Sequence, residues 1–213
     1  MRHVIVVLSV LLLWTAGASA ATYEIKHDAR TGNAWYGGDD RPSFGPRHVG
    51  KGQSVIVHSA IQLESFSLAF DREFDYYENP EGVGHEVTLV LHVRDDQGVI
   101  LKRMELVVPD SYEGGWVTWQ GIDLPVAAET TLIFTSYLIG AYDANQYVGR
   151  VTVDSSNGYP DGGHLTASGT SDADLESWST WGNPQRNDLK FWLVGTATVS
   201  GQPVSIGSVK SMY

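Results

Sequence analysis

The sequence contains no cysteine, so the chain can form neither disulfide bonds nor thiolate metal sites. Its 14 lysines and arginines stand against 25 aspartates and glutamates, which gives a formal net charge of −11 at pH 7. Binding to a nucleic-acid backbone needs clustered Lys and Arg, and this balance argues against nucleic acid as a partner. Charged residues make up only 18% of the chain and hydrophobic residues 42%, which excludes a disordered acidic tail and indicates a folded core.

The motifs of familiar enzyme classes are also missing. The chain has no G-x-S-x-G, no H-E-x-x-H, no Walker loop and no G-x-G-x-x-G. His85-Glu86 begins like a zinc-protease motif, but the next histidine is His92 and the segment has the periodicity of a strand, whereas the motif needs a helix. We assign no catalytic residue. An enzyme remains an open alternative, because the two carboxylates of a glycosidase leave no pattern in a sequence.

The first twenty residues are predicted to be a secretory signal peptide. After a short polar start, residues 4–14 are an apolar run broken only by Ser9, and Ala18-Ser19-Ala20 supplies the small residues of a cleavage site. The run is too short to span about 30 Å of hydrocarbon at about 1.5 Å per residue. We expect cleavage between Ala20 and Ala21. The mature protein is then expected to be secreted, extracellular or periplasmic, and free of the membrane.

Composition divides the remaining chain into three regions. Residues 21–52 are dense in glycine and proline and are predicted to be an irregular N-terminal arm, with an edge strand followed by a loop as the alternative. Residues 53–199 contain short runs of alternating hydrophobic residues and are predicted to be the folded domain. Residues 200–213 are polar and are expected to be a C-terminal tail.

Strand periodicity dominates the folded domain. Residues 86–94 and 99–108 alternate clearly, and the Asp/Gly turn between them is typical of a β-hairpin. Residues 171–177 are the helical candidate, a single turn with capping residues at its start. Further strands are expected at 53–58, 61–70, 116–119, 131–139, 147–154 and 189–199. About eight or nine strands predict an all-β protein, an antiparallel β-sandwich that is jelly-roll-like.

Residues 147–199 contain an ordered set of motifs. A strand at 147–154 is followed by the turn Ser155-Ser156-Asn157-Gly158-Tyr159-Pro160-Asp161-Gly162-Gly163, then by Trp181 and by Asn187-Asp188-Leu189-Lys190-Phe191. This order resembles the β-sandwich accessory modules of bacterial secreted and surface proteins and of carbohydrate-active enzymes, which have an SSNPYxGG-like turn and a W…DLxFxxxG ending. The resemblance implies a β-sandwich with a binding or accessory role.

Aromatic side chains in polar surroundings are the strongest signal for a ligand. Sugar rings present apolar C–H faces, which pack on tryptophan and tyrosine rings. Trp192 is expected on the outer face of its strand, because Leu189 and Phe191 alternate with it and are expected in the core. Core packing is the alternative for each tryptophan. The candidate ligand-binding residues are Tyr142, Arg150, Trp178, Trp181 and Trp192.

A calcium site is the second candidate. Asp172, Asp174 and Glu176 offer carboxylate oxygens at alternate positions, although the segment lacks the glycine and the distal glutamate of an EF-hand loop. A protein without disulfides would gain stability from one bound Ca²⁺. The alternative interpretation of the same residues is a capped helical turn at the surface.

These observations together favour one function over two others. The leading expectation is a secreted, non-catalytic module that binds an extracellular glycan. The first alternative is a secreted glycoside hydrolase or polysaccharide lyase on a jelly-roll scaffold. The second is a structural protein of the extracellular matrix or cell surface, which would present an exposed apolar patch to other proteins.

Overall fold

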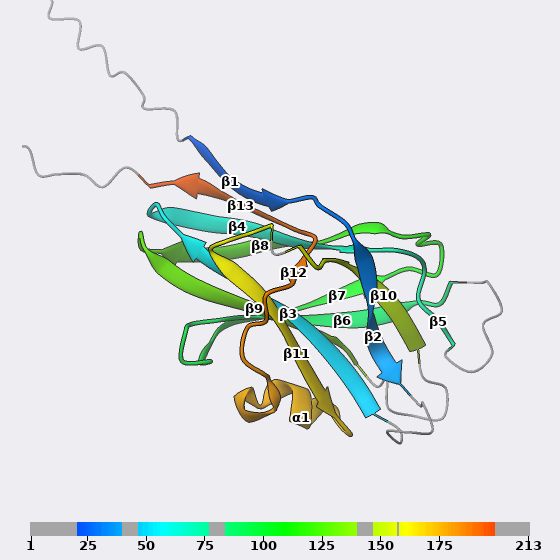
Figure 1. The fold of residues 1–213 in the computed structure, drawn as a ribbon. Coiled ribbons are helices and arrows are strands. Elements are labelled where there is room, and N and C mark those ends of the chain that lie inside the picture. The colour runs from blue at the N-terminus through cyan, green and yellow to red at the C-terminus, as the bar shows by residue number, and fades with distance from the viewer. Residues whose placement is uncertain (1–20, 40–46, 77–83, 140–146, 157, 199–213) are drawn as a thin grey trace, which may run out of the picture.

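The computed structural model describes residues 21–39, 47–76, 84–139, 147–156 and 158–198 (Figure 1). The predicted signal peptide and the whole of the predicted C-terminal tail lie outside these residues, and so does the ligand candidate Tyr142. Within the described residues no helix has the length and apolar character that crossing a membrane requires.

One antiparallel sheet of thirteen strands organises the described residues. Its hydrogen-bonded path runs β1-β13-β4-β10-β2-β3-β9-β6-β7, with β8 on β4, β11 on β3, and β5 and β12 on β10. The sheet does not close into a barrel, and the prediction of an antiparallel all-β protein is confirmed. The strands are β1 (Thr22–His27), β2 (Gly32–Asp39), β3 (Arg47–Val57), β4 (Ile61–Phe70), β5 (Asp75–Tyr76), β6 (Val87–Arg94), β7 (Ile100–Val108), β8 (Gly115–Val126), β9 (Thr130–Leu138), β10 (Tyr147–Asp154), β11 (Gly162–Gly169), β12 (Asp188–Leu189) and β13 (Phe191–Ala197).

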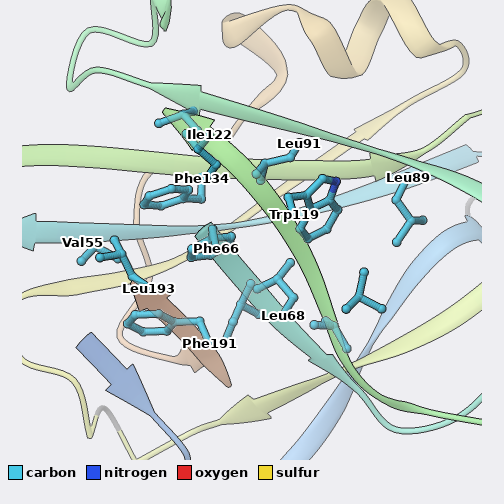
Figure 2. Packing of buried hydrophobic residues seen from close by; sticks show 14 of the residues in the cluster. Val55, Phe66, Leu68, Leu89, Leu91, Trp119, Ile122, Phe134, Phe191 and Leu193 are labelled. Carbon is cyan, nitrogen blue, oxygen red and sulfur yellow. The ribbon is translucent and has the colours of Figure 1, made fainter. Parts of the chain in front are cut away.

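The two halves of the sheet face each other around a hydrophobic core. Phe66 of β4 stacks on Phe134 of β9, with ring centroids 4.0 Å apart and ring planes at 6°. Trp119 of β8, Leu91 of β6 and Leu193 of β13 are buried in the same cluster (Figure 2). Burial of each such side chain contributes roughly 1.5–3 kcal/mol. This core therefore fixes β13, β4 and β8 on one side and β9 and β6 on the other.

The hairpin predicted in the sequence is present. β6 and β7 pair in one register from Val87 opposite Val108 to Val93 opposite Lys102, and the register shifts at Arg94, next to the turn. Gly98 closes that turn with a φ of +84°, a conformation that favours glycine. The Asp95 carboxylate accepts hydrogen bonds from the backbone of Gln97 and Val99, which holds the turn in shape.

The prediction of an irregular arm at 21–52 is wrong. This region contains β1, β2 and the first part of β3. The density of glycine suggested loops. Gly50 and Gly52, however, lie inside β3, where the ring of Trp181 approaches the backbone. Glycine here allows close packing on a strand and does not mark a turn.

Two further differences concern β8 and β11. The short run expected at 116–119 is part of a strand of 12 residues. β11 pairs along β3 from Gly162 opposite Val55 to Gly169 opposite His48, in a region where no strand was predicted. Its sequence, GGHLTASG, has little hydrophobic alternation, because Leu165 and Ala167, which are buried under a neighbouring segment, stand among glycines and polar residues.

That neighbouring segment is the predicted helical turn. The helix α1 (Asp172–Glu176) begins after Ser171, whose side chain accepts a hydrogen bond from the backbone N–H of Asp174, as the capping prediction required. A 3₁₀ turn (Trp178–Thr180) follows. The segment lies against β11 and β3 (Figure 1) and closes a second core that contains Leu175.

Candidate functional site

Two tryptophans lie together on the outer face of β1, β13, β4 and β8. Trp192 of β13 alternates with Phe191 and Leu193, which are fully buried, so its ring lies on the side away from the core. Trp116 of β8 meets Trp192 with ring centroids 6.3 Å apart at 65°. Both indoles are half-buried, and the sequence prediction for the outward position of Trp192 is confirmed.

Strand register explains why these side chains meet. Lys26 of β1 lies opposite Trp192, and Trp192 lies opposite Ser67 of β4. Ser67 in turn lies opposite Thr118 of β8 and shares a hydrogen bond of 2.9 Å with it. Directly opposite residues share one face of a sheet, so one row of side chains crosses four strands. Trp116 is two residues from Thr118 and therefore lies on the same face.

Charged groups surround the two rings. The Lys26 ammonium lies 5.2 Å from the ring centroid of Trp192 and 5.7 Å from that of Trp116. The Lys190 ammonium lies 5.3 Å from the Trp116 centroid. All three distances are within cation–π range. We call the set Lys26, Asp28, Trp116, Lys190 and Trp192 the tryptophan face.

Asp28 links the two lysines of the tryptophan face. Its carboxylate lies 2.5 Å from the Lys190 ammonium and 3.1 Å from the Lys26 ammonium. Hydrogen bonds from Lys190 and then from Lys26 lower the pKa of Asp28 below its ordinary value. The lysine side chains are thus held over the indoles while their charged ends stay accessible, with Lys26 at 40% exposure.

The other ligand candidates lie elsewhere. Arg150 is half-buried on β10 and alternates with Val151 of the core, so it faces away from the core. Trp178 is half-buried and packs on the β6–β7 turn, where a Cβ at Gly98 would lie 2.2 Å from its ring. The guanidinium of Arg94 lies 5.8 Å from the Trp178 centroid. Trp178 therefore contributes to holding the 171–181 segment on the sheet.

Trp181 does not form an exposed platform. It is only 7% exposed, and its indole N–H donates a 2.9 Å hydrogen bond to the Leu175 carbonyl. The prediction for Trp181 rested on the polar residues that surround it in the sequence. That argument considered only the loop itself, whereas the ring packs against Gly50 and Gly52 of β3, more than a hundred residues earlier in the chain.

The three calcium candidates each have a different partner. Asp174 accepts a 2.7 Å hydrogen bond from the backbone of Thr170, and Glu176 accepts one of 2.9 Å from the Tyr137 hydroxyl. The Asp172 carboxylate lies 3.6 Å from His48 Nδ1. Asp174 lies about 200° around the helix from both Asp172 and Glu176, because each residue turns about 100°. Within the described part of the chain, no group of three or more His, Cys, Asp or Glu side chains is arranged to hold a metal ion, and the calcium site stays a prediction.

The structure contains a buried pair of carboxylates that the sequence analysis did not predict. Asp154 of β10 and Asp188 of β12 lie opposite each other, and both are fully buried. The Asp154 carboxylate lies 3.1 Å from His27 Nε2 and accepts hydrogen bonds from the backbone and hydroxyl of Ser156. The bonds from Ser156 hold the pKa of Asp154 below its ordinary value.

Asp188 fastens the other end of the same turn. It accepts a 3.0 Å hydrogen bond from the Tyr159 backbone and one of 3.1 Å from the Gln53 amide. Burial raises the pKa of Asp188 above its ordinary value. A Cβ at Gly158 would lie 2.7 Å from an Asp154 oxygen, so the turn packs directly on the pair. The motif residues at 154–163 and 187–191 thus act together, as the two anchors of one turn.

Comparison with known proteins adds no family. No protein-family model matches the chain, and no curated protein sequence matches it. The chain is an all-antiparallel β-sheet protein, and its function has to be argued from its own side chains.

Proposed function

We propose that this protein is a secreted, non-catalytic binding module whose ligand is an extracellular glycan. The observation that carries the proposal is the tryptophan face, on which Trp116 and Trp192 lie together with Lys26, Asp28 and Lys190. Indole rings provide a large, rigid apolar surface on which the C–H face of a sugar ring can pack. The charged groups beside them provide hydrogen-bond donors and an acceptor for sugar hydroxyls.

The rigidity of the face supports the same role. Each strand of the face is held by ladders on the sheet, and the inward residues Phe191, Leu193 and Phe66 lie in the main core. A ligand that packs on a preformed surface loses less free energy to ordering of side chains. The jelly-roll-like sandwich expected from the sequence belongs to this proposal, and the packing of two sheet halves around one core supports it.

The two alternative functions receive unequal support. Asp154 and Asp188 are paired but fully buried beneath a turn, so they do not favour a glycoside hydrolase, which needs carboxylates open to a cleft. Contact with other proteins is favoured by the apolar side chains exposed on β7.

The test is a binding screen of the mature protein against a panel of polysaccharides, with hydrolysis measured on the same panel. For the polysaccharide that binds, Trp192→Ala and Trp116→Ala are each expected to weaken affinity at least about tenfold. Trp178→Ala is the matched control, because this half-buried indole lies beside the β6–β7 turn and not on the tryptophan face. Unchanged affinity in both face variants, or release of sugars from the panel, contradicts the proposal.

A further inference from the structure

β7 lies at an edge of the sheet. In the described residues it pairs with β6 alone, so one side of its backbone has no strand partner there. Large apolar side chains are nevertheless exposed along it, with Ile100 at 41%, Leu101 at 43% and Val107 at 55% exposure. An edge strand with open N–H and C=O groups and exposed apolar side chains is a template for another strand.

The outward side chains of β7 are arranged symmetrically about Met104. Reading along the strand, they are Leu101, Arg103, Glu105 and Val107, all exposed, whereas Met104 between them is half-buried. An apolar residue lies at each end and two opposite charges lie in the middle. Such an order is complementary to itself when the strand is reversed.

We propose that two copies of this chain associate by antiparallel pairing of their β7 edges, with Met104 on the two-fold axis. In this register Arg103 lies opposite Glu105 of the second copy, and Leu101 lies opposite its Val107. Each of these pairs occurs twice, because the interface is symmetric. Opposite-charge pairs and apolar pairs directly across an antiparallel ladder stabilise it.

The charges specify the register. A shift of the axis to Arg103 places the two Arg103 guanidinium groups opposite each other, and a shift to Glu105 does the same with two carboxylates. Like charges directly opposite each other destabilise a ladder. On the inner side, Lys102 then lies opposite Leu106, against which its aliphatic stem can pack while its ammonium group stays in water.

The net charge of the protein opposes association of two copies, whereas the local charge of β7 does not. The chain carries a net charge of −11, so two copies repel each other over most of their surfaces. β7 has Lys102 and Arg103 against Glu105 and is therefore net positive. The ion pair between Arg103 and Glu105 inside one chain, at 2.6 Å, holds both charges on the outward side of the strand.

Sedimentation velocity over a concentration series tests the pairing. The mature protein is expected to form a dimer whose population grows with protein concentration. Arg103→Glu and Glu105→Arg are each expected to weaken dimerisation at least about tenfold, because each places like charges opposite each other. An equimolar mixture of the two variants is expected to form a heterodimer within about threefold of the original affinity, since every pair across the axis is again of opposite charge.

Three results overturn the proposal. The first is a mature protein that stays monomeric at every concentration. The second is a dimer that neither charge reversal weakens, which would place the contact on another face. The third is a mixture of the two variants that stays monomeric while each melts within a few degrees of the original protein.

Cross-linking gives an independent measurement of the register. The chain has no cysteine, so Leu101→Cys and Val107→Cys variants each carry a single thiol. Directly opposite residues in an antiparallel ladder have Cα atoms about 4.5–5.5 Å apart, within the range that a disulfide can bridge. The mixed variants are expected to form a disulfide-linked heterodimer faster than either variant links to itself. Equal rates for all three combinations contradict the register.

Discussion

The indole ring of Trp181 rests directly on Gly50 of β3. A Cβ atom at Gly50 would lie 2.8 Å from Cη2 of that ring, closer than such atoms approach in proteins. The indole N–H donates to the carbonyl of Leu175 in α1. The segment that follows β11 is therefore fastened to the sheet by one large ring, which needs a strand position without a side chain beneath it.

Gly50→Ala is expected to destabilise the protein by about 1–3 kcal/mol, because the added methyl group overpacks the contact with Trp181. Chemical denaturation of the mature protein measures this loss. Gly182→Ala is the matched control, since a Cβ there would lie at an ordinary 3.5 Å from the Thr166 carbonyl oxygen. The control is expected to change stability by less than about 0.5 kcal/mol. Equal effects of the two substitutions would contradict this account of the contact.

Arg94 of β6 also fastens the segment that follows β11 to the sheet. Arg94 is 2% exposed, and its guanidinium donates to the carbonyl oxygens of Gly98 and Glu176, at 2.8 and 2.7 Å. Arg94→Met is expected to cost about 2–4 kcal/mol, because two buried acceptors lose their donor. Hydrogen exchange should also show faster exchange of the Trp181 backbone N–H. Arg30→Ala, at an exposed ion pair with Asp71, is the control and is expected to cost less than about 1 kcal/mol.

Three buried histidines make the fold sensitive to acid. Burial lowers the pKa of His48 to about 3, of His92 to about 4 and of His164 to about 3. In the unfolded chain these groups titrate near about 6.5, so between that pH and about 4 the unfolded state binds more protons than the native state. Stability is therefore complete above about pH 6.5 and falls as the pH falls, by up to about 1.4 kcal/mol per pH unit for each histidine.

Urea denaturation at several pH values between 7.5 and 5 measures this slope. His164→Gln removes one titrating group, so it is expected to reduce the slope of the unfolding free energy against pH by up to about 1.4 kcal/mol per pH unit. The raised pKa of Asp188 acts in the opposite direction, since protonation of that buried carboxyl favours the native state. A stability that is flat from pH 7.5 to 5 would disprove the role of the histidines.

The alternation of residues in 188–193 shows how far the sequence alone could be read. The period of two placed Phe191 in the core and Trp192 outside it, and the structure agrees. Extended to Asp188, the same alternation puts this residue on the outer face with Trp192, yet Asp188 is fully buried. Its carboxylate is held by the backbone of Tyr159 and the amide of Gln53. Partners that are 29 and 135 residues away leave no periodic signal.

The sequence predicted only part of the tryptophan face, because the rest depends on long-range strand pairing. Trp192 could be placed outward from its own strand. Its neighbours Trp116 and Lys26 come from β8 and β1, which reach it through strand register. β1 itself falls in the region expected to be irregular, so the cation over the rings could not be foreseen. Short-range patterns predict faces of strands, and long-range pairing decides which faces meet.

Chemical-shift mapping of the tryptophan indole N–H groups tests the proposed glycan site most directly. An oligosaccharide from the polysaccharide that binds in the screen is titrated into the isotopically labelled mature protein. The account predicts shifts at the indoles of Trp116 and Trp192, and none at those of the buried Trp119 and Trp181. Shifts confined to Trp178, or no shift at any indole in the presence of bound oligosaccharide, would contradict the claim that the tryptophan face binds the glycan.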